Sequence, residues 1–243
     1  MLGNWTVQQA KYSEHGEFIL TFLLSEFERV FGHGVMANED CIVYNDPSAS
    51  CPMLVINTTP VRIRLSQPSY IYWCQTIYQL SHEMCHYAFR QRKENKDFTL
   101  SWFEELVCEA VSLYALKYAS DHWNHCPLSK VAPTFFQNHK TYLEDELSKS
   151  FTDEFKQCDT VEKLMEYERQ KVSTNRRETQ GAERNLIFRM ILDNPMESKS
   201  VLDYSRYVMG NGVLIDFDRW IRDDPCNLLQ KLKAIQPVRG ECI

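Results

Sequence analysis

The stretch QLSHEMCHYAF, residues 79–89, carries two histidines four positions apart, with a glutamate directly after the first. On an α-helix, residues i and i+4 lie on the same face, with their Cβ atoms about 5–6 Å apart. Glu83 is the only formally charged residue in this mostly apolar stretch. A lone carboxylate on a buried helix is costly unless it has a partner. The pattern predicts a buried helix over about residues 69–92, with a polar site formed by His82, Glu83 and His86.

Two imidazoles at this spacing can bind one metal ion. Zinc accepts histidine nitrogens at about 2.0–2.1 Å, and catalytic zinc sites use three protein ligands and keep a fourth position open. Glu83 can project beside the histidines and act as general base toward a water molecule that the metal activates. The motif therefore predicts one Zn²⁺ ion held by His82 and His86, with a third ligand elsewhere in the chain.

Candidates for the third ligand lie in a second apolar segment, SWFEELVCEAVSLYAL (101–116). Eighteen residues separate His86 from Glu105, and Glu109 is the only charged residue of the segment after Glu105. Glu105 and Glu109 share one helix face, whereas Glu104 is rotated by about 100°. Glu105 is the expected ligand, Glu109 is expected to orient a ligating histidine, and Glu104 is expected near the helix N-terminus. Glu109 and Glu104 stay open as alternative ligands.

This arrangement resembles the gluzincin metallopeptidases, in which His-Glu-x-x-His is followed after about eighteen residues by a glutamate ligand on a second helix. The segment WFEE (102–105) is similar to the Trp-x-x pattern that precedes this glutamate in the aminopeptidase branch. The thermolysin-like branch has a supporting acidic residue four positions later, where this chain has Glu109. The resemblance covers about residues 60–116. It implies a zincin-like core, one zinc ion and hydrolysis of a peptide bond with Glu83 as general base.

Peptide hydrolysis also needs a hydrogen-bond donor for the developing oxyanion. Three tyrosines are candidates: Tyr114, Tyr204 and Tyr207. The last two lie in LDYSRYVMGNG (202–212), for which an amphipathic helix that ends at glycine is the alternative interpretation. The segment DHWNHC (121–126) groups further metal-binding residue types, but its place after a helix favours a solvated loop.

The remaining patterns predict an α+β fold. An amphipathic helix is expected over residues 16–31, followed by short strands at 41–45, 53–57 and 61–66. The last of these, VRIRLS, alternates apolar and polar residues, as a half-exposed or an edge strand would. It is expected to be the edge strand along which an extended peptide substrate pairs. Most of the rest is predicted to be helical, over about residues 136–150, 152–171, 179–193, 198–209 and 225–234.

This order of elements places a zincin-like catalytic core at residues 1–125, with an N-terminal helix, a small mixed sheet, the His-Glu-x-x-His helix and the Glu-bearing helix. A helical C-terminal subdomain, packed on the core, is expected at residues 126–243, and a single domain is the alternative. The net charge of −6 argues against nucleic-acid and membrane-surface binding. Nine cysteines without framework spacing, and an N-terminus without a signal-peptide pattern, favour a cytoplasmic protein.

Together these features predict a zinc-dependent peptidase of narrow specificity that acts on a peptide or protein substrate. The alternative is a regulatory or binding protein on a zincin scaffold, in which the metal is structural or absent. The lack of a secretion signal makes this alternative a serious one, because a cytoplasmic protease needs restraint. A regulatory partner would supply that restraint.

Overall fold

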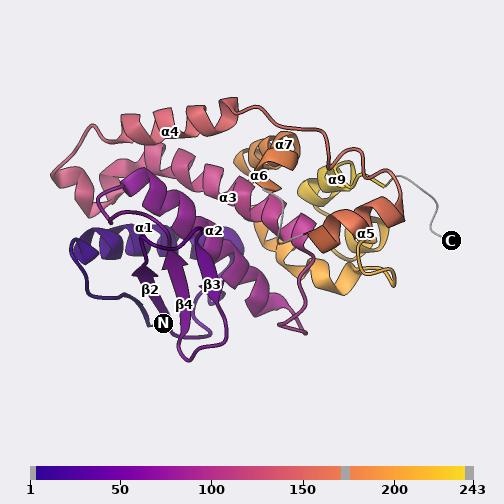
Figure 1. Cartoon of the computed structure of the whole chain (residues 1–243), viewed down its shortest axis with the longest axis horizontal. Coiled ribbons are helices and arrows are strands. Elements are labelled where there is room, and N and C mark those ends of the chain that lie inside the picture. Colours follow the sequence, from indigo (N-terminus) through magenta and orange to yellow (C-terminus); the bar gives the residue numbers. More distant parts are fainter. Residues whose placement is uncertain (1–3, 171–175, 239–243) are drawn as a thin grey trace. The chain divides into compact units, whose positions relative to one another are not determined.

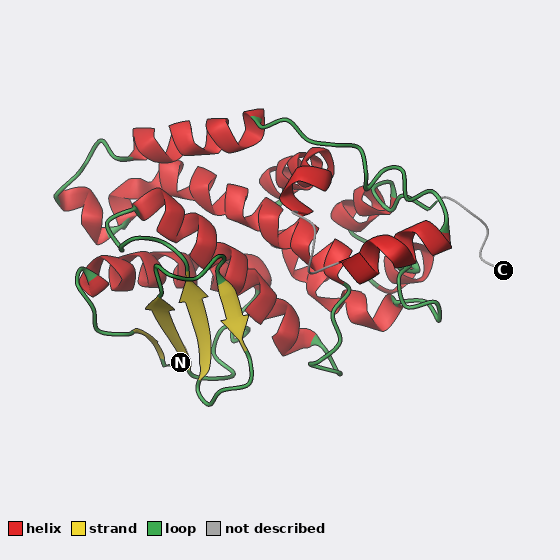
Figure 2. Ribbon diagram, viewed as in Figure 1, coloured by secondary structure: helices red, strands yellow, loops and turns green. Residues whose placement is uncertain are grey.

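The structure is a computed structural model that describes residues 4–170 and 176–238 (Figure 1). It has the predicted α+β fold, in which a small mixed sheet accompanies many helices (Figure 2). The chain forms two compact units, one of residues 1–91 with 111–148 and one of residues 92–110 with 149–243. The predicted boundary near residue 125 therefore falls inside the first unit.

The sheet belongs to the first unit and has the strand order β1-β2-β4-β3, of which Figure 1 labels β2, β4 and β3. β1 (Trp5–Val7), β2 (Cys41–Asn45) and β4 (Val61–Leu65) are parallel, and β3 (Met53–Val55) pairs antiparallel with β4. Burial alternates along β4, as predicted, but β4 has a strand on each side. The prediction that it is an edge strand is therefore wrong. Alternation shows which face of a strand is buried and does not show how many neighbours the strand has.

Two side chains of helix α2 (Trp73–Arg92) hold it against this sheet. The indole of Trp5 in β1 packs edge-on against the ring of Tyr87, with ring centroids 4.8 Å apart. The side-chain carbonyl of Gln79 accepts a hydrogen bond of 2.9 Å from the backbone amide of Ser66, directly after β4. The helix that carries the His-Glu-x-x-His motif is thus fixed at two points along its length.

Helix α1 (Ser13–Phe31) also packs closely in the first unit. A Cβ atom on Gly16 would lie 2.8 Å from the ring of Tyr70, so the glycine allows α1 to approach the segment that leads into α2. The indole Nε1 of Trp73 donates a hydrogen bond of 3.1 Å to Nδ1 of His15. These contacts set the beginning of α2 against the beginning of α1.

Helix α3 (Ser101–His122) is one uninterrupted helix. Its residues up to Ala110 belong to the second unit, and the residues that follow belong to the first. The carboxylate of Glu168 caps its beginning, because it accepts hydrogen bonds from the amides of Ser101 at 2.8 Å and Trp102 at 3.0 Å. The cap comes from a distant part of the chain, so the local sequence does not reveal it.

The remaining helices follow the predicted order, with changes at their ends. The helix expected over residues 152–171 begins only at Val161, where the side chain of Thr160 accepts a hydrogen bond from the amide of Lys163. Residue 171 itself lies outside the described residues. The segment expected as a helix over 198–209 forms a 3₁₀ helix, η4 (Pro195–Tyr207). The other helices are α4 (Phe136–Ser148), α5 (Val161–Arg169), α6 (Arg176–Thr179), α7 (Gly181–Asp193), α8 (Phe217–Asp223) and α9 (Asn227–Lys233).

None of the helices in the described part of the chain has the length and apolar character needed to cross a bilayer.

Candidate metal centre

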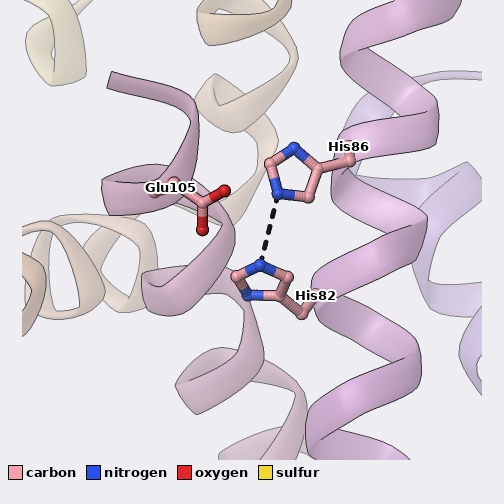
Figure 3. A group of neighbouring side chains, drawn as sticks. All are labelled: His82, His86 and Glu105. Atoms are coloured by element: carbon pink, nitrogen blue, oxygen red, sulfur yellow. Dashed lines mark hydrogen bonds between the residues drawn. The ribbon is translucent and has the colours of Figure 1, made fainter. Parts of the chain in front are cut away.

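The two histidines of the motif lie on one face of α2, with their side chains turned toward each other (Figure 3). The Nε2 atoms of His82 and His86 are 3.2 Å apart, and their ring planes meet at 67°. Two ligands on one tetrahedral zinc ion at about 2.0–2.1 Å would be separated by about 3.3–3.4 Å. The observed separation therefore suits two nitrogens that bind the same ion, and it also suits a hydrogen bond between them.

Glu105 completes the group. One carboxylate oxygen of Glu105 and one ring nitrogen of each histidine all lie within 4.8 Å of one another. Figure 3 shows the carboxylate facing the two imidazoles. In the parts of the chain that the structure describes, no other set of three such side chains is grouped in this way. Two imidazoles and one carboxylate are a donor set that zinc accepts, so these residues fit the ion that the motif predicts.

The two alternative ligands have cationic partners instead. Glu104 is 2% exposed, pairs with Lys93 and accepts a hydrogen bond from the hydroxyl of Tyr204. The carboxylate of Glu109 lies 3.9 Å from the guanidinium of Arg184, and both side chains are buried. Sequence reasoning missed both cations, because each comes from a separate segment of the chain. The expectation that Glu109 orients a ligating histidine stays a prediction.

Glu83, the predicted general base, follows His82 directly on α2 and is 4% exposed. Because consecutive residues of a helix are separated by about 100° around its axis, the side chain of Glu83 leaves α2 about 100° from that of His82. The burial of Glu83 agrees with the expectation that the stretch 79–89, in which Glu83 is the only formal charge, forms a buried helix. Its catalytic role stays a prediction.

Among the predicted oxyanion donors, Tyr114 follows Glu105 on α3 by nine residues, which corresponds to about half a turn beyond two full turns. The two side chains therefore leave opposite faces of the helix. The hydroxyl of Tyr114 donates to Glu26 and accepts a hydrogen bond of 2.9 Å from Arg29. Burial and the charge of Glu26 raise the pKa of Tyr114, so the hydroxyl remains protonated. Its contacts tie α3 to α1.

Tyr204 and Tyr207 belong to the second unit. Tyr204 is fully buried, and its hydroxyl donates to Glu104 and accepts a hydrogen bond of 3.1 Å from the amide of Leu100. The ring of Tyr207 stacks on Trp220, with centroids 5.1 Å apart and planes at 12°. The structure gives both tyrosines packing roles, and their service as oxyanion donors stays a prediction.

The segment DHWNHC is more ordered than the predicted solvated loop. It contains the end of α3 and the 3₁₀ helix η1 (Trp123–His125), directly before the 3₁₀ helix η2 (Pro127–Lys130). Trp123 and Cys126 are buried, whereas His122 and His125 are exposed. The apolar side chains therefore anchor the segment and leave its histidines in solvent.

Comparison of the chain with protein-family models, with curated proteins and with solved structures found no match. The resemblance to the gluzincins accordingly rests on the motif, its spacing and the grouping of three ligand atoms.

Proposed function

We propose that the protein is a zinc-dependent peptidase with a zincin-like core. The observation that carries this proposal is the grouping of ligand atoms from His82, His86 and Glu105 within 4.8 Å of one another. Three protein ligands leave one coordination position for water or substrate, as in catalytic zinc sites, whereas structural sites use four. His86 and Glu105 are also partly exposed, which suits a site that a substrate must reach.

The chain's own residues have distinct roles in this proposal. Bound zinc would polarise the scissile carbonyl and lower the pKa of a water molecule. His82 and His86 would hold the ion through Nε2, which requires that each ring carries its proton on Nδ1. Glu83 would accept a proton from the attacking water and pass it to the leaving amine.

The substrate segment is proposed to pair with β3 rather than with β4. Within the described residues β3 is the last strand of the sheet, and its neighbour on the other side is β4. A peptide in extended conformation can add to such an edge through main-chain hydrogen bonds.

The test compares wild type with Glu83→Gln, which keeps the shape of the side chain and removes the base. Both proteins should hold one zinc ion per chain, measured by elemental analysis. Cleavage of a broad peptide library should fall by at least about 100-fold in the variant, because general-base catalysis contributes about 10²–10⁴-fold. Glu17→Gln, at an exposed position of α1, is the matched control and should change neither quantity.

Wild-type protein without stoichiometric zinc would refute the proposal. Bound zinc with no cleavage of any library peptide would favour the alternative, a regulatory or binding protein on the same scaffold.

A further inference from the structure

The first turn of α3 is held by contacts that the proposed chemistry does not use, and all of them lie within the second unit. Glu168 of α5 binds the amides of Ser101 and Trp102. The indole of Trp102 donates a hydrogen bond of 2.8 Å to the carbonyl of Val213. The side-chain amide of Gln180 donates one of 2.9 Å to the carbonyl of Trp102. Three distant segments therefore fix the turn that carries the proposed carboxylate ligand.

A buried ion pair lies on the same turn. Lys93 and Glu104 pair with side chains that are 3% and 2% exposed, and the ammonium of Lys93 also donates a hydrogen bond of 2.8 Å to the carbonyl of Phe98. The hydroxyl of Tyr204 donates to Glu104 and accepts from the amide of Leu100. Burial and the charge of Glu104 raise the pKa of Tyr204, so the hydroxyl stays a donor. Because its members have several partners each, this network favours one orientation of Glu104.

The orientation of Glu104 also determines that of Glu105. The two residues are adjacent on a helix, so their side chains leave it about 100° apart. Ser101, Trp102, Phe103 and Glu104 are all buried, whereas Glu105 is partly exposed. A first turn that could rotate would bring either glutamate toward the histidines, which is one part of the ambiguity present in the sequence. With Glu104 held, the carboxylate of Glu105 faces them.

We propose that Lys93, Glu104, Glu168 and Tyr204, here named the first-turn network, are positioning residues for the ligand Glu105. This inference rests on the proposed zinc site. The network would act on the ion only through Glu105, by fixing the rotation of α3 about its axis. Residues that orient a metal ligand without binding the metal themselves typically lower metal affinity by about 10–100-fold when they are substituted.

The test measures zinc affinity of the metal-depleted protein by competition with a chromophoric chelator. Tyr204→Phe keeps the ring and removes the hydroxyl that holds Glu104, so zinc should bind about tenfold more weakly. The visible absorption of the Co²⁺-substituted protein should change as well, because it reports the geometry of the ligands. Tyr114→Phe is the matched control, since it also removes a buried hydroxyl that donates to a buried glutamate. It should keep wild-type zinc affinity and the wild-type cobalt spectrum.

The outcomes separate this inference from the proposed function. Zinc affinity and a cobalt spectrum equal to wild type in Tyr204→Phe would overturn the positioning role and leave the zinc site standing. Wild type that binds no zinc, or Glu105→Gln with unchanged affinity, would remove the site itself. If Tyr204→Phe does not fold, Glu168→Gln decides: about tenfold weaker zinc binding supports positioning, and unchanged binding overturns it.

Discussion

The buried side chain of His139 makes the free energy of unfolding depend on pH, and its lowered pKa gives the size of the effect. It is fully buried in α4, where its ring packs against those of Trp123 and Phe135 at centroid distances of 4.7 and 5.1 Å. Its Nδ1 atom lies 3.3 Å from the sulfur of Cys74. Burial lowers the pKa of His139 from 6.5 to about 4, and burial raises the pKa of the Cys74 thiol to about 12. Both groups are therefore neutral at pH 7.

The direction of the effect follows from proton binding in the two states. The unfolded chain binds a proton at His139 near pH 6.5, whereas the folded protein binds it only near pH 4. Between these values the unfolded state holds more protons, so the free energy of unfolding falls as the pH decreases. Each pH unit in this window costs about 1.4 kcal/mol. The loss relative to pH 7 is about 2 kcal/mol at pH 5 and about 3 kcal/mol at pH 4.

The perturbation is His139→Phe, which keeps an aromatic ring in the site and removes the titration. Urea unfolding of both proteins would be measured from pH 7 to pH 4 with a chelator present. Carboxylates titrate in both proteins, so their contribution cancels in the difference. From pH 7 to pH 4, the free energy of unfolding of the variant should fall by about 3 kcal/mol less than that of wild type. Parallel curves, or a His139 resonance that titrates near pH 6.5 in NMR spectra, would refute the reasoning.

Glu105→Ala should lower zinc affinity by at least about 100-fold, because it removes one of three ligands, whereas the exposed Glu166→Ala should leave it unchanged; equal affinities would exclude Glu105 from the site. Gly16→Ala should reduce the free energy of unfolding, measured in urea, by about 1–3 kcal/mol, because the new Cβ would lie 2.8 Å from the ring of Tyr70. Gly210→Ala, with no atom within 4 Å of its Cβ, should change it by less than about 0.5 kcal/mol. Equal effects of the two glycine substitutions would contradict the packing argument. Chelation of zinc should lower the Tm of wild type and leave the Tm of Glu105→Ala unchanged, as scanning calorimetry would show.

Local patterns in the sequence predicted most of the fold. The strand expected at residues 41–45 has the same ends as β2, because β-branched residues and flanking turn residues mark it locally. The Glu-bearing helix expected from the segment 101–116 is α3, which continues to His122. β1 was not predicted, because three residues carry no periodic signal and only pairing with β2 makes them a strand. The position of β4 inside the sheet was missed for the same reason, since strand pairing is not local.

The part of the candidate site that depends on residue spacing along a helix was predictable from the sequence. The spacing of the motif and of Glu105 predicted three side chains on two helices, and the structure groups their ligand atoms. The sequence favoured Glu105 and left Glu104 and Glu109 open as ligands, because it does not show that these two have Lys93 and Arg184 as partners. Neither cation carries a sequence signal that links it to α3.

The remote cap of α3 has a consequence for the order in which the chain folds during synthesis. The first unit is complete in sequence at residue 148, so it can fold before the rest of the protein has left the ribosome. The amides of Ser101 and Trp102 receive their cap only when Glu168 has been made. The segment 92–110, which includes Glu105, therefore reaches its folded conformation only after a later part of the chain has been made. We expect a nascent chain that ends near residue 150 to present the two histidines without a fixed Glu105, so that the proposed zinc site forms only after Glu168 has been made.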